Sequence, residues 1–549
     1  VISGWAEVEW IEPYIPPKLL NDVAVGVAKM NVTNVWADLG LTGTGQVIAV
    51  CDTGLDTGNT NTLHRDFTGR VVWAQALGRP GNWSDTHSHG THVAGSVLGS
   101  GFSSTGRIKG VAYQAQLVFQ SVLDSGGGLG GLPADLGDLF RAAYTNGAHI
   151  HSDSWGSSVE GEYTIECQQL DRFVWSNRNM LILFAASNDG IDGDDDGVID
   201  LDSLGAPGTA KNCLTVGAAE NYRTSGGLSG YTWGDAWPSD YSADPIASDY
   251  LSRPDAPQGM AAFSSRGPCD DGRIKPDIVA PGTDILSTRS KATSDTGWGA
   301  YGGNTNYIFM GGTSMATPLT AGAAGLVRQW LVQNAGITNP SAALMKALMM
   351  NGARNMAPGQ YGTGATQPNN VSGWGHVDLF NTLQPSANLA LRLYDTNSLA
   401  TGESNQFTVA VAAPTTEKFT ITLAYSDYWA ASGAGKKLVN DLDLIVTKPL
   451  GGAVFANGST QLDSTNNVET VEFVADEAGT YTIQVSARNV PQGGQQPYAL
   501  VLLSPPDATP TAPFFGPNPG PFSTTSSVPV SFTVRANGYP LPSLSLLSN

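Results

Sequence analysis

Three short segments of this sequence each hold one side chain that could take part in catalysis. Asp52 follows the apolar run VIAVC, His89 opens the string HGTHVAG, and Ser314 lies in GTSMATP, just after a pair of glycines. A serine hydroxyl is a poor nucleophile at neutral pH and needs an adjacent base, which itself needs an orienting carboxylate. One Asp, one His and one Ser supply these parts, so the pattern predicts acyl transfer through a serine nucleophile.

Each of these residues also has a simpler interpretation. An Asp at the end of a strand, or a Ser at the start of a helix, is more often a turn or capping residue. Three matches in the order Asp, His, Ser favour catalysis over that interpretation. A zinc site formed by His87, His89 and His92 is disfavoured, because their spacing is not that of a helical metal site and no Glu stands where a metalloprotease needs one.

The elements that must position these side chains alternate along the first two thirds of the chain. Short apolar runs are separated by helical stretches, which predicts βαβ units and a parallel sheet with buried strands. We expect strands at 46–51, 116–122, 181–186 and 213–217, and helices at 133–146, 314–335 and 341–351. From about Ala387 to Leu503, β-rich segments separated by Gly, Asn and Pro turns predict an antiparallel sandwich.

The three segments resemble the signatures of the subtilisin-like serine proteases. The closest resemblance within that family is to the oxidatively stable alkaline proteases that carry a C-terminal jelly-roll domain. It rests on NDVA at 21–24, LVNDLDL at 438–444, NNVE at 466–469 and GTYTI at 479–483. The family implies an α/β fold with a parallel sheet flanked by helices, followed by an all-β jelly-roll sandwich. It also implies a serine endopeptidase in which Ser314 attacks, His89 relays the proton and Asp52 orients His89.

The resemblance divides the chain into four parts. Residues 1–20 look like the end of an inhibitory propeptide, which autoprocessing would remove near Leu20–Asn21. Residues 21–386 form the catalytic domain and 387–503 the β-sandwich. Residues 504–549 begin with a Pro- and Thr-rich linker, and the strand-like segments 527–536 and 543–547 suggest a truncated immunoglobulin-like module.

Further residues of the site come from the same resemblance. FAASN at 184–188 resembles the segment that ends in the oxyanion-hole asparagine, which assigns that role to Asn188, although the family usually has Gly where Ser187 stands. SWG and DSGGG, at 154–156 and 124–128, resemble the two edges that pair with the substrate backbone; taken alone, each is more often a structural glycine-rich loop. The predicted substrate-binding residues are Ser154, Trp155, Gly156, Gly126, Gly127 and Ala186.

Seven aspartates fall within the 14 residues from Asp189 to Asp202. Aligned to an EF-hand-type calcium loop, Asp192, Asp194 and Asp196 take the first, third and fifth ligand positions, Val198 offers its carbonyl and Asp200 takes the ninth. Ser203 stands where a bidentate Glu is expected, so Asp202 or an outside residue would complete the shell. The alternative is a solvated acidic loop. A second calcium site is predicted at Asp427, Asn440, Asp441 and Asp443, whose alternative interpretation is turn residues with satisfied hydrogen bonds.

Composition excludes some classes of partner. The 549 residues carry a formal net charge of −20 and only 14% are charged, which is typical of a compact secreted protein and argues against nucleic acid or an anionic membrane, since both bind basic patches. Four cysteines are too few for a disulfide scaffold. They allow three full pairings, or one bridge and two buried thiols, and Cys51 is expected to be a core thiol.

We therefore expect a secreted, monomeric serine endopeptidase of broad specificity, stabilised by calcium, whose partners are polypeptide substrates and its own propeptide. The alternative is a catalytically silent binding protein that keeps a protease fold.

Overall fold

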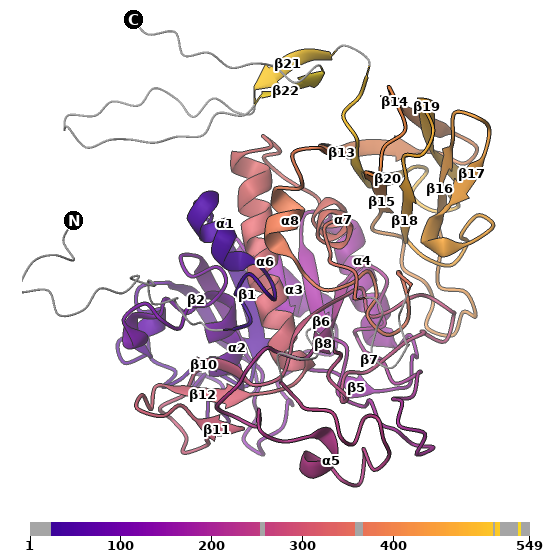
Figure 1. Cartoon of the computed structure of the whole chain (residues 1–549). Helices are drawn as coiled ribbons and strands as arrows, with labels where there is room; N and C mark the ends of the chain where they lie inside the picture. Colours follow the sequence, from indigo (N-terminus) through magenta and orange to yellow (C-terminus); the bar gives the residue numbers. More distant parts are fainter. Residues whose placement is uncertain (1–22, 253–258, 357–365, 509–510, 516–535, 540–549) are drawn as a thin grey trace, which may run out of the picture.

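The computed structural model describes residues 23–252, 259–356, 366–508, 511–515 and 536–539 (Figure 1). The predicted propeptide remnant at 1–20 and its cleavage point lie outside these residues. So do the segment at 543–547 and all of 527–536 except Ala536. The two described pieces near the C-terminus, β21 (Thr511–Phe515) and β22 (Ala536–Tyr539), pair as antiparallel strands.

The first part of the chain is built on a seven-stranded parallel sheet in the order β2-β3-β1-β4-β6-β8-β9. The central strands are buried along almost their whole length, as expected for a parallel sheet covered on both faces. The strands predicted at 46–51, 116–122, 181–186 and 213–217 correspond to β1, β3, β6 and β8. The bounds are β1 Val47–Asp52, β2 Val71–Ala76, β3 Gln116–Ser121, β4 Ile150–Asp153, β6 Leu181–Ala185, β8 Leu214–Ala219 and β9 Ile278–Pro281.

Helices cover both faces of this sheet (Figure 1). The long helix α6 crosses one face with α2 beside it, while α3 and α4 pack against each other on the opposite face. The predicted helices at 133–146, 314–335 and 341–351 correspond to α3, α6 and α7. The bounds are α1 Val32–Asp38, α2 His89–Leu98, α3 Leu136–Thr145, α4 Ile165–Ser176, α5 Trp233–Ala236, α6 Thr313–Gln333, α7 Ala342–Asn351 and α8 Leu379–Leu383.

The topology brings the predicted catalytic segments to one edge of the sheet. Asp52 is the last residue of β1, Ser154 follows β4 directly and Asn188 follows β6. Because parallel strands end at the same edge, these residues share a site with the N-termini of α2 and α6, which carry His89 and Ser314. Small sheets flank this edge: β10 (Ile285–Thr288) with β12 (Tyr307–Met310) and β11 (Gly299–Ala300), and β5 (Ser157–Ser158) with β7 (Gly205–Ala206).

The second part is a sandwich of two four-stranded antiparallel sheets, β13-β20-β15-β18 and β14-β19-β16-β17. Alternating residues such as Phe419, Ile421, Leu442 and Leu444 form a separate hydrophobic core between the sheets. The bounds are β13 Ala390–Leu399, β14 Ser404–Val411, β15 Lys418–Ala424, β16 Asp441–Thr447, β17 Ala453–Phe455, β18 Val468–Val474, β19 Gly479–Asn489 and β20 Gln496–Ser504. The α/β architecture followed by an all-β sandwich is therefore confirmed.

The sandwich packs directly on the α/β part. Strands β15 and β20 lie against α7, and Asn351 at the end of that helix donates its side-chain amide to the Thr420 carbonyl at 2.8 Å. The indole N–H of Trp374 donates to Thr470 Oγ1 at 2.7 Å. These contacts make the sandwich a supporting element of the sheet that holds the site.

All four cysteines lie among the described residues and are free, buried thiols. Cys51 has no exposed surface, and burial raises its pKa well above the ordinary range, as expected for a thiol in the core. Among the helices described, none combines the length and apolar character required to cross a bilayer.

Candidate active site

Asp52 and His89 form the best-defined contact of the site. Asp52 Oδ1 lies 2.7 Å from His89 Nδ1 and also accepts the Thr53 N–H at 2.7 Å. The Asp52 side chain is 2% exposed and that of His89 is 31% exposed. The buried carboxylate therefore orients the imidazole through Nδ1, while the other ring nitrogen remains available on the exposed side.

Gly90 allows α2 to come close enough for this contact. A Cβ atom at this position would lie 2.3 Å from the Gly54 carbonyl oxygen and 3.1 Å from Asp52 Cβ. Any side chain here would push the helix away from the turn that follows β1 and would separate His89 from Asp52. Gly90, the first glycine of the HGTHVAG string, is thus required for the close approach of α2 to the turn after β1.

Ser314 occupies the first turn of α6, after Gly312, whose positive φ of 146° with a ψ of 161° is a backbone conformation that favours glycine. Its hydroxyl donates to the Ser154 carbonyl at 3.1 Å, and the Ser154 hydroxyl donates back to the Ser314 carbonyl at 2.9 Å. Among the described contacts, the Ser314 hydroxyl has no hydrogen bond to His89. Such bonds are commonly long without substrate and tighten in the reacting complex.

Two hydrogen-bond donors converge beside Gly312. Asn188 accepts the Thr313 N–H at 2.8 Å and the Thr313 hydroxyl at 3.0 Å through its Oδ1 atom, which orients its amide nitrogen. A Cβ atom on Gly312 would lie 3.6 Å from Asn188 Nδ2 and 3.5 Å from the Ser314 amide nitrogen. The two donors therefore border one point in space, which is the arrangement that stabilises a tetrahedral oxyanion.

The predicted substrate edge at Ser154–Gly156 lies next to Ser314. Trp155 packs edge-on against Phe184, with ring centroids 5.0 Å apart. A Cβ atom on Gly156 would lie 2.8 Å from the Ala206 carbonyl oxygen, so the chain at this point passes close to β7. The predicted substrate edge thus lies against β7, the strand that precedes β8 in the chain.

The opposite edge is an exposed glycine loop held by one carboxylate. Asp124 accepts the N–H groups of Gly126, Gly128 and Gly130 at 2.8–3.2 Å. The amide of Gly128, followed by that of Gly126, lowers the pKa of Asp124. A Cβ on Gly127 would lie 3.7 Å from His87 Nε2, so this loop lies beside the histidine segment.

Ala186 does not fit its predicted role. Its side chain has no exposed surface, and its backbone is paired with Val216 and Gly205, so it cannot contact a substrate directly. Ala186 follows β6 directly and still lies in the buried interior. Ser187, the next residue, is partly exposed, adopts a φ of 92° and donates its hydroxyl to Asp189.

The electrostatics of the pair favour a histidine that can accept a proton. Burial disfavours the charged imidazolium, but the negative charge and hydrogen bond of Asp52 outweigh it, so the pKa of His89 is raised above its ordinary value. Burial lowers the pKa of His92, on the same helix, to about 3. His92 is therefore neutral, and its Nε2–H donates to the Ile285 carbonyl at 3.0 Å.

The loop after Asn188 has the geometry of a cation site. Side-chain oxygens of Asp192, Asp194 and Asp196 lie within 4.8 Å of one another, and Asp192 accepts the N–H groups of Asp196 and Gly197. Gly197 has a φ of 84°, and a Cβ there would lie 2.0 Å from the Asp244 carbonyl oxygen. Asp200 accepts the Gly193 N–H at 2.8 Å, so the loop closes on itself around the three carboxylates.

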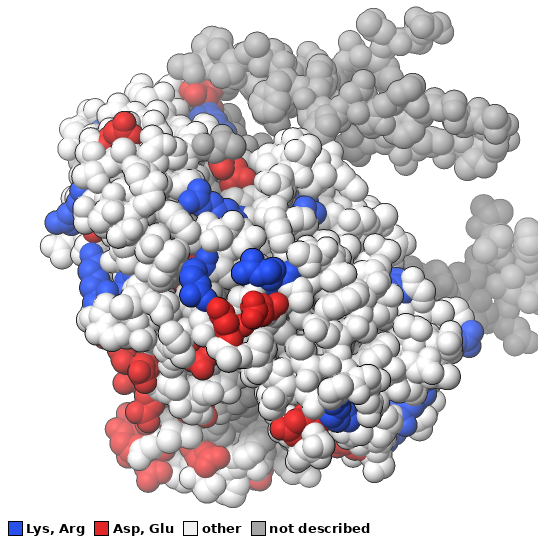
Figure 2. Space-filling model, turned by 180° about the vertical axis from the view of Figure 1, so that it is seen from behind, with Lys and Arg blue, Asp and Glu red and all other residues white. Residues whose placement is uncertain are grey.

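The loop contains seven aspartates between Asp189 and Asp202, and acidic side chains also gather on one face of the molecule. Figure 2 shows acidic side chains gathered toward the lower left of the face in view, with few Lys or Arg nearby. Carboxylate oxygens at this spacing are the ligands that Ca²⁺ prefers. The described residues therefore fit a bound calcium ion at Asp192, Asp194 and Asp196, with the Val198 carbonyl and Asp200 close by in the same loop.

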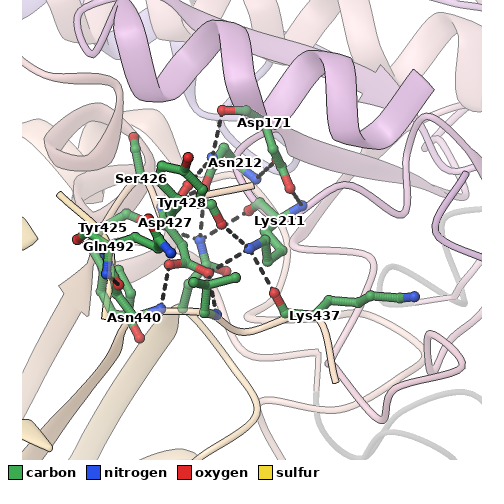
Figure 3. A network of polar contacts seen from close by, with 12 residues as sticks. Asp171, Lys211, Asn212, Tyr425, Ser426, Asp427, Tyr428, Lys437, Asn440 and Gln492 are labelled. Carbon is green, nitrogen blue, oxygen red and sulfur yellow. Dashed lines mark hydrogen bonds and ion pairs between the residues drawn. The ribbon is translucent and has the colours of Figure 1, made fainter. Parts of the chain in front are cut away.

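Two residues of the predicted sandwich site have other partners (Figure 3). Asp427 forms a fully buried ion pair with Lys211 and also accepts the N–H groups of Val439 and Asn440. The Asn440 side chain bonds to Gln492 and Gln496. Both carboxylate oxygens of Asp427 thus accept hydrogen bonds from the protein's own donors, and the Asn440 side chain is bonded as well. Asp427 and Asn440 are therefore not available as calcium ligands.

Asp441 and Asp443 remain as candidate ligands. Asp441 Oδ1, Asp443 Oδ1 and Glu469 Oε1 are buried and have no hydrogen-bond partner among the described residues. Burial, followed by the charge of Asp441, raises the pKa of Asp443 to about 6. A calcium ion at this second position stays a prediction.

A parallel sheet that carries Asp52, His89 and Ser314 at its carboxyl edge defines the class of subtilisin-like folds. Residues 43–375 match the Subtilase family (Peptidase_S8), and the chain belongs to that family. It is 31% identical to Serine protease AprX of Bacillus subtilis (strain 168), over 60% of this chain and 66% of the relative. It is 29% identical to Subtilisin Savinase of Lederbergia lenta, over 53% of this chain and 78% of the relative.

A third relative is larger. Serine protease/ABC transporter B family protein tagB of Dictyostelium discoideum is 28% identical over 87% of this chain, and the aligned part is 31% of the tagB sequence. The chain thus spans about a third of the length of that relative.

Two buried carboxylates have contacts that were not predicted from the sequence. Asp85, four residues before His89, is buried and bonds to Thr53 and Thr91; an aspartate just ahead of a helix is a capping signal that could have drawn attention to it. The Lys211–Asp427 pair has no sequence signal, because its members are 216 residues apart.

Proposed function

We propose that this protein is a secreted, calcium-stabilised serine endopeptidase of broad specificity. The observation that carries the proposal is the 2.7 Å contact of Asp52 with His89, at the sheet edge where Ser314 and two oxyanion donors also lie. The names of the relatives, which include serine proteases, support the same reaction class. The low share of charged residues, 14%, supports an extracellular location.

The proposed reaction follows from the positions of these groups. Ser314 Oγ attacks the scissile carbonyl while His89 takes its proton, and Asp52 stabilises the imidazolium that forms. Asn188 Nδ2 and the Ser314 N–H donate to the oxyanion. His89 then gives the proton to the departing amine, and water releases the acyl group from Ser314 by the same route in reverse.

We expect broad cleavage with a bias toward apolar or aromatic residues before the cut. An extended peptide between the Ser154–Gly156 edge and the Gly126–Gly127 loop would be held mainly through its main chain, which tolerates many sequences. The aromatic pair of Trp155 and Phe184 beside that edge favours the apolar bias. Mass spectrometry of a digested peptide library would give the cleavage profile, with the Ser314→Ala protein as background. Cleavage confined to one residue type would contradict broad specificity.

Removing calcium is expected to lower both thermal stability and activity. A ligand that binds only the folded state stabilises it by about 2.7 kcal/mol when its free concentration is 100 times Kd. The acidic loop starts directly after Asn188, and Gly190 bonds to the Phe263 carbonyl, so loss of the ion would loosen the segment that orients the oxyanion donor. Calorimetric melting with and without a chelator, together with calcium titration, would measure both effects.

Matched variants separate calcium binding from general damage. Asp194→Asn changes an exposed side chain and should abolish the response of the melting temperature to calcium. Asp138→Asn changes an exposed aspartate on α3 and should leave that response intact. Equal melting temperature and activity in excess chelator would rule out the structural role of calcium.

A further inference from the structure

Asp85 is a buried carboxylate beside the catalytic pair that the proposed reaction leaves unused. Its side chain has no exposed surface. One oxygen accepts the Thr53 hydroxyl at 3.0 Å and the His87 N–H at 3.1 Å, and the other accepts the N–H and hydroxyl of Thr91. A carboxylate is costly to desolvate unless it is hydrogen-bonded, and four donors from two separate segments meet this one.

Thr53 connects Asp85 to the catalytic aspartate. Its hydroxyl oxygen lies 3.0 Å from Asp85 Oδ1 and 3.2 Å from Asp52 Oδ1, and it accepts the Gly90 N–H at 3.0 Å. A hydroxyl carries a single proton, so the two aspartates compete for it. The shorter distance favours Asp85, and Asp52 then keeps His89 and the Thr53 N–H as its donors.

We propose that Asp85 is a positioning residue for the triad: it draws the Thr53 hydroxyl proton away from Asp52 and ties the first turn of α2 to the turn after β1. Asp52 is thereby left with its full charge directed at His89. The role rests on the proposed function, because it acts only through the pair Asp52–His89.

Other titratable groups lie on the elements around His89. On α2, burial lowers the pKa of His92 to about 3, so His92 is neutral. On β4, Asp153 is buried near Asp52 and paired with His151 at 2.8 Å. In the turn after β1, Asp56 pairs with Lys291. Burial lowers the pKa of His89, and among the described residues the charges that raise it are those of Asp52 and Asp85.

The pH dependence of kcat/KM tests the proposal. His89 must be neutral to accept the Ser314 proton, so activity is lost as the pH falls through its pKa. Asp85→Asn removes one negative charge and frees the Thr53 proton to bond to Asp52. Both changes lower the pKa of His89, so the acid limb of the profile should move to lower pH, while kcat falls about tenfold through the weaker hold on the imidazolium. Damage to packing alone would lower kcat without moving that limb.

Two sets of variants complete the test. Asp66→Asn is the matched control, because Asp66 is equally buried and binds Gly101, Ser103 and Tyr307 beyond the C-terminal end of α2; its acid limb should not move. Thr53→Ala should lower kcat about tenfold and Thr53→Ser should restore it, even if Asp85→Asn fails to fold. An unmoved acid limb in folded Asp85→Asn, or full activity in Thr53→Ala, would overturn the role of Asp85. Activity of Ser314→Ala close to that of the unmodified protein would instead overturn the triad.

Discussion

Replacing Ser314 with alanine is expected to lower kcat/KM for peptide hydrolysis by about 10⁶-fold, the loss that removal of the serine causes in the related enzyme subtilisin. The reason is that the proposed reaction uses the Ser314 hydroxyl as the attacking group, at the start of α6 where the Ser314 N–H and Asn188 border one point. Without it, binding and the oxyanion donors still leave some rate above that in water. Hydrolysis of a fluorogenic peptide and labelling by a fluorophosphonate would measure the loss.

The matched control is another serine at the start of a helix. Ser341 caps α7 by accepting the Leu344 N–H at 2.9 Å, so Ser341→Ala should cost about 1 kcal/mol of stability and leave labelling unchanged. If the unmodified protein neither hydrolyses peptides nor labels at Ser314, the alternative of a catalytically silent binding protein with this fold would replace the proposal.

The largest effect on stability is expected from Asp427→Leu, which should lower the free energy of unfolding by about 3–5 kcal/mol. Both side chains of the Lys211–Asp427 pair are fully buried, and Lys211 also donates to the carbonyls of Tyr428 and Lys437 (Figure 3). Removing the carboxylate leaves a buried ammonium without its counter-charge. Calorimetry in the Ser314→Ala background, where self-digestion cannot interfere, would measure the change.

Two comparisons make this result specific. The exposed pair Lys418–Glu472 has a similar separation, 2.6 Å, but side chains that are 57% and 47% exposed, so Glu472→Gln should change stability by only about 0–1 kcal/mol. Replacing both Lys211 and Asp427 with apolar residues should recover most of the lost stability. A loss below 1 kcal/mol for Asp427→Leu would show that this pair does not hold the sandwich to the α/β part.

The fold could be predicted largely from the sequence, for physical reasons that apply to particular segments. A parallel strand covered on both faces must be apolar along its length, and VIAVC before Asp52 and LILFA before Asn188 show this directly. The catalytic candidates could be predicted because each lies next to glycines in the sequence, and Gly90 shows that such a glycine allows a close approach of two segments. The loop at 192–200 could be found because ligand spacing in a cation loop is local.

Other features depended on contacts between distant segments. Asp427 and Asn440 have the composition of cation ligands, but their partners Lys211 and Gln496 come from other parts of the chain. Ala186 was predicted to bind substrate from the family resemblance of its segment, yet its backbone is paired with Val216 and Gly205. The hydrogen bond of Ser314 to Ser154 could not be predicted either, because the acceptor of a hydroxyl depends on which groups the complete fold brings next to it.

The positions of the catalytic residues along the chain have a consequence for synthesis. Asp52 and His89 emerge from the ribosome before Ser314, which follows His89 by 225 residues, and Asp427, which secures the second part, is later still. At about 5–20 residues per second, the base and its carboxylate exist for roughly 10–45 s before any nucleophile is present. Under the proposed function, the nascent chain would gain cutting activity only after α6 has been made and has inserted beside α2. The order of the chain itself would then prevent self-digestion during translation.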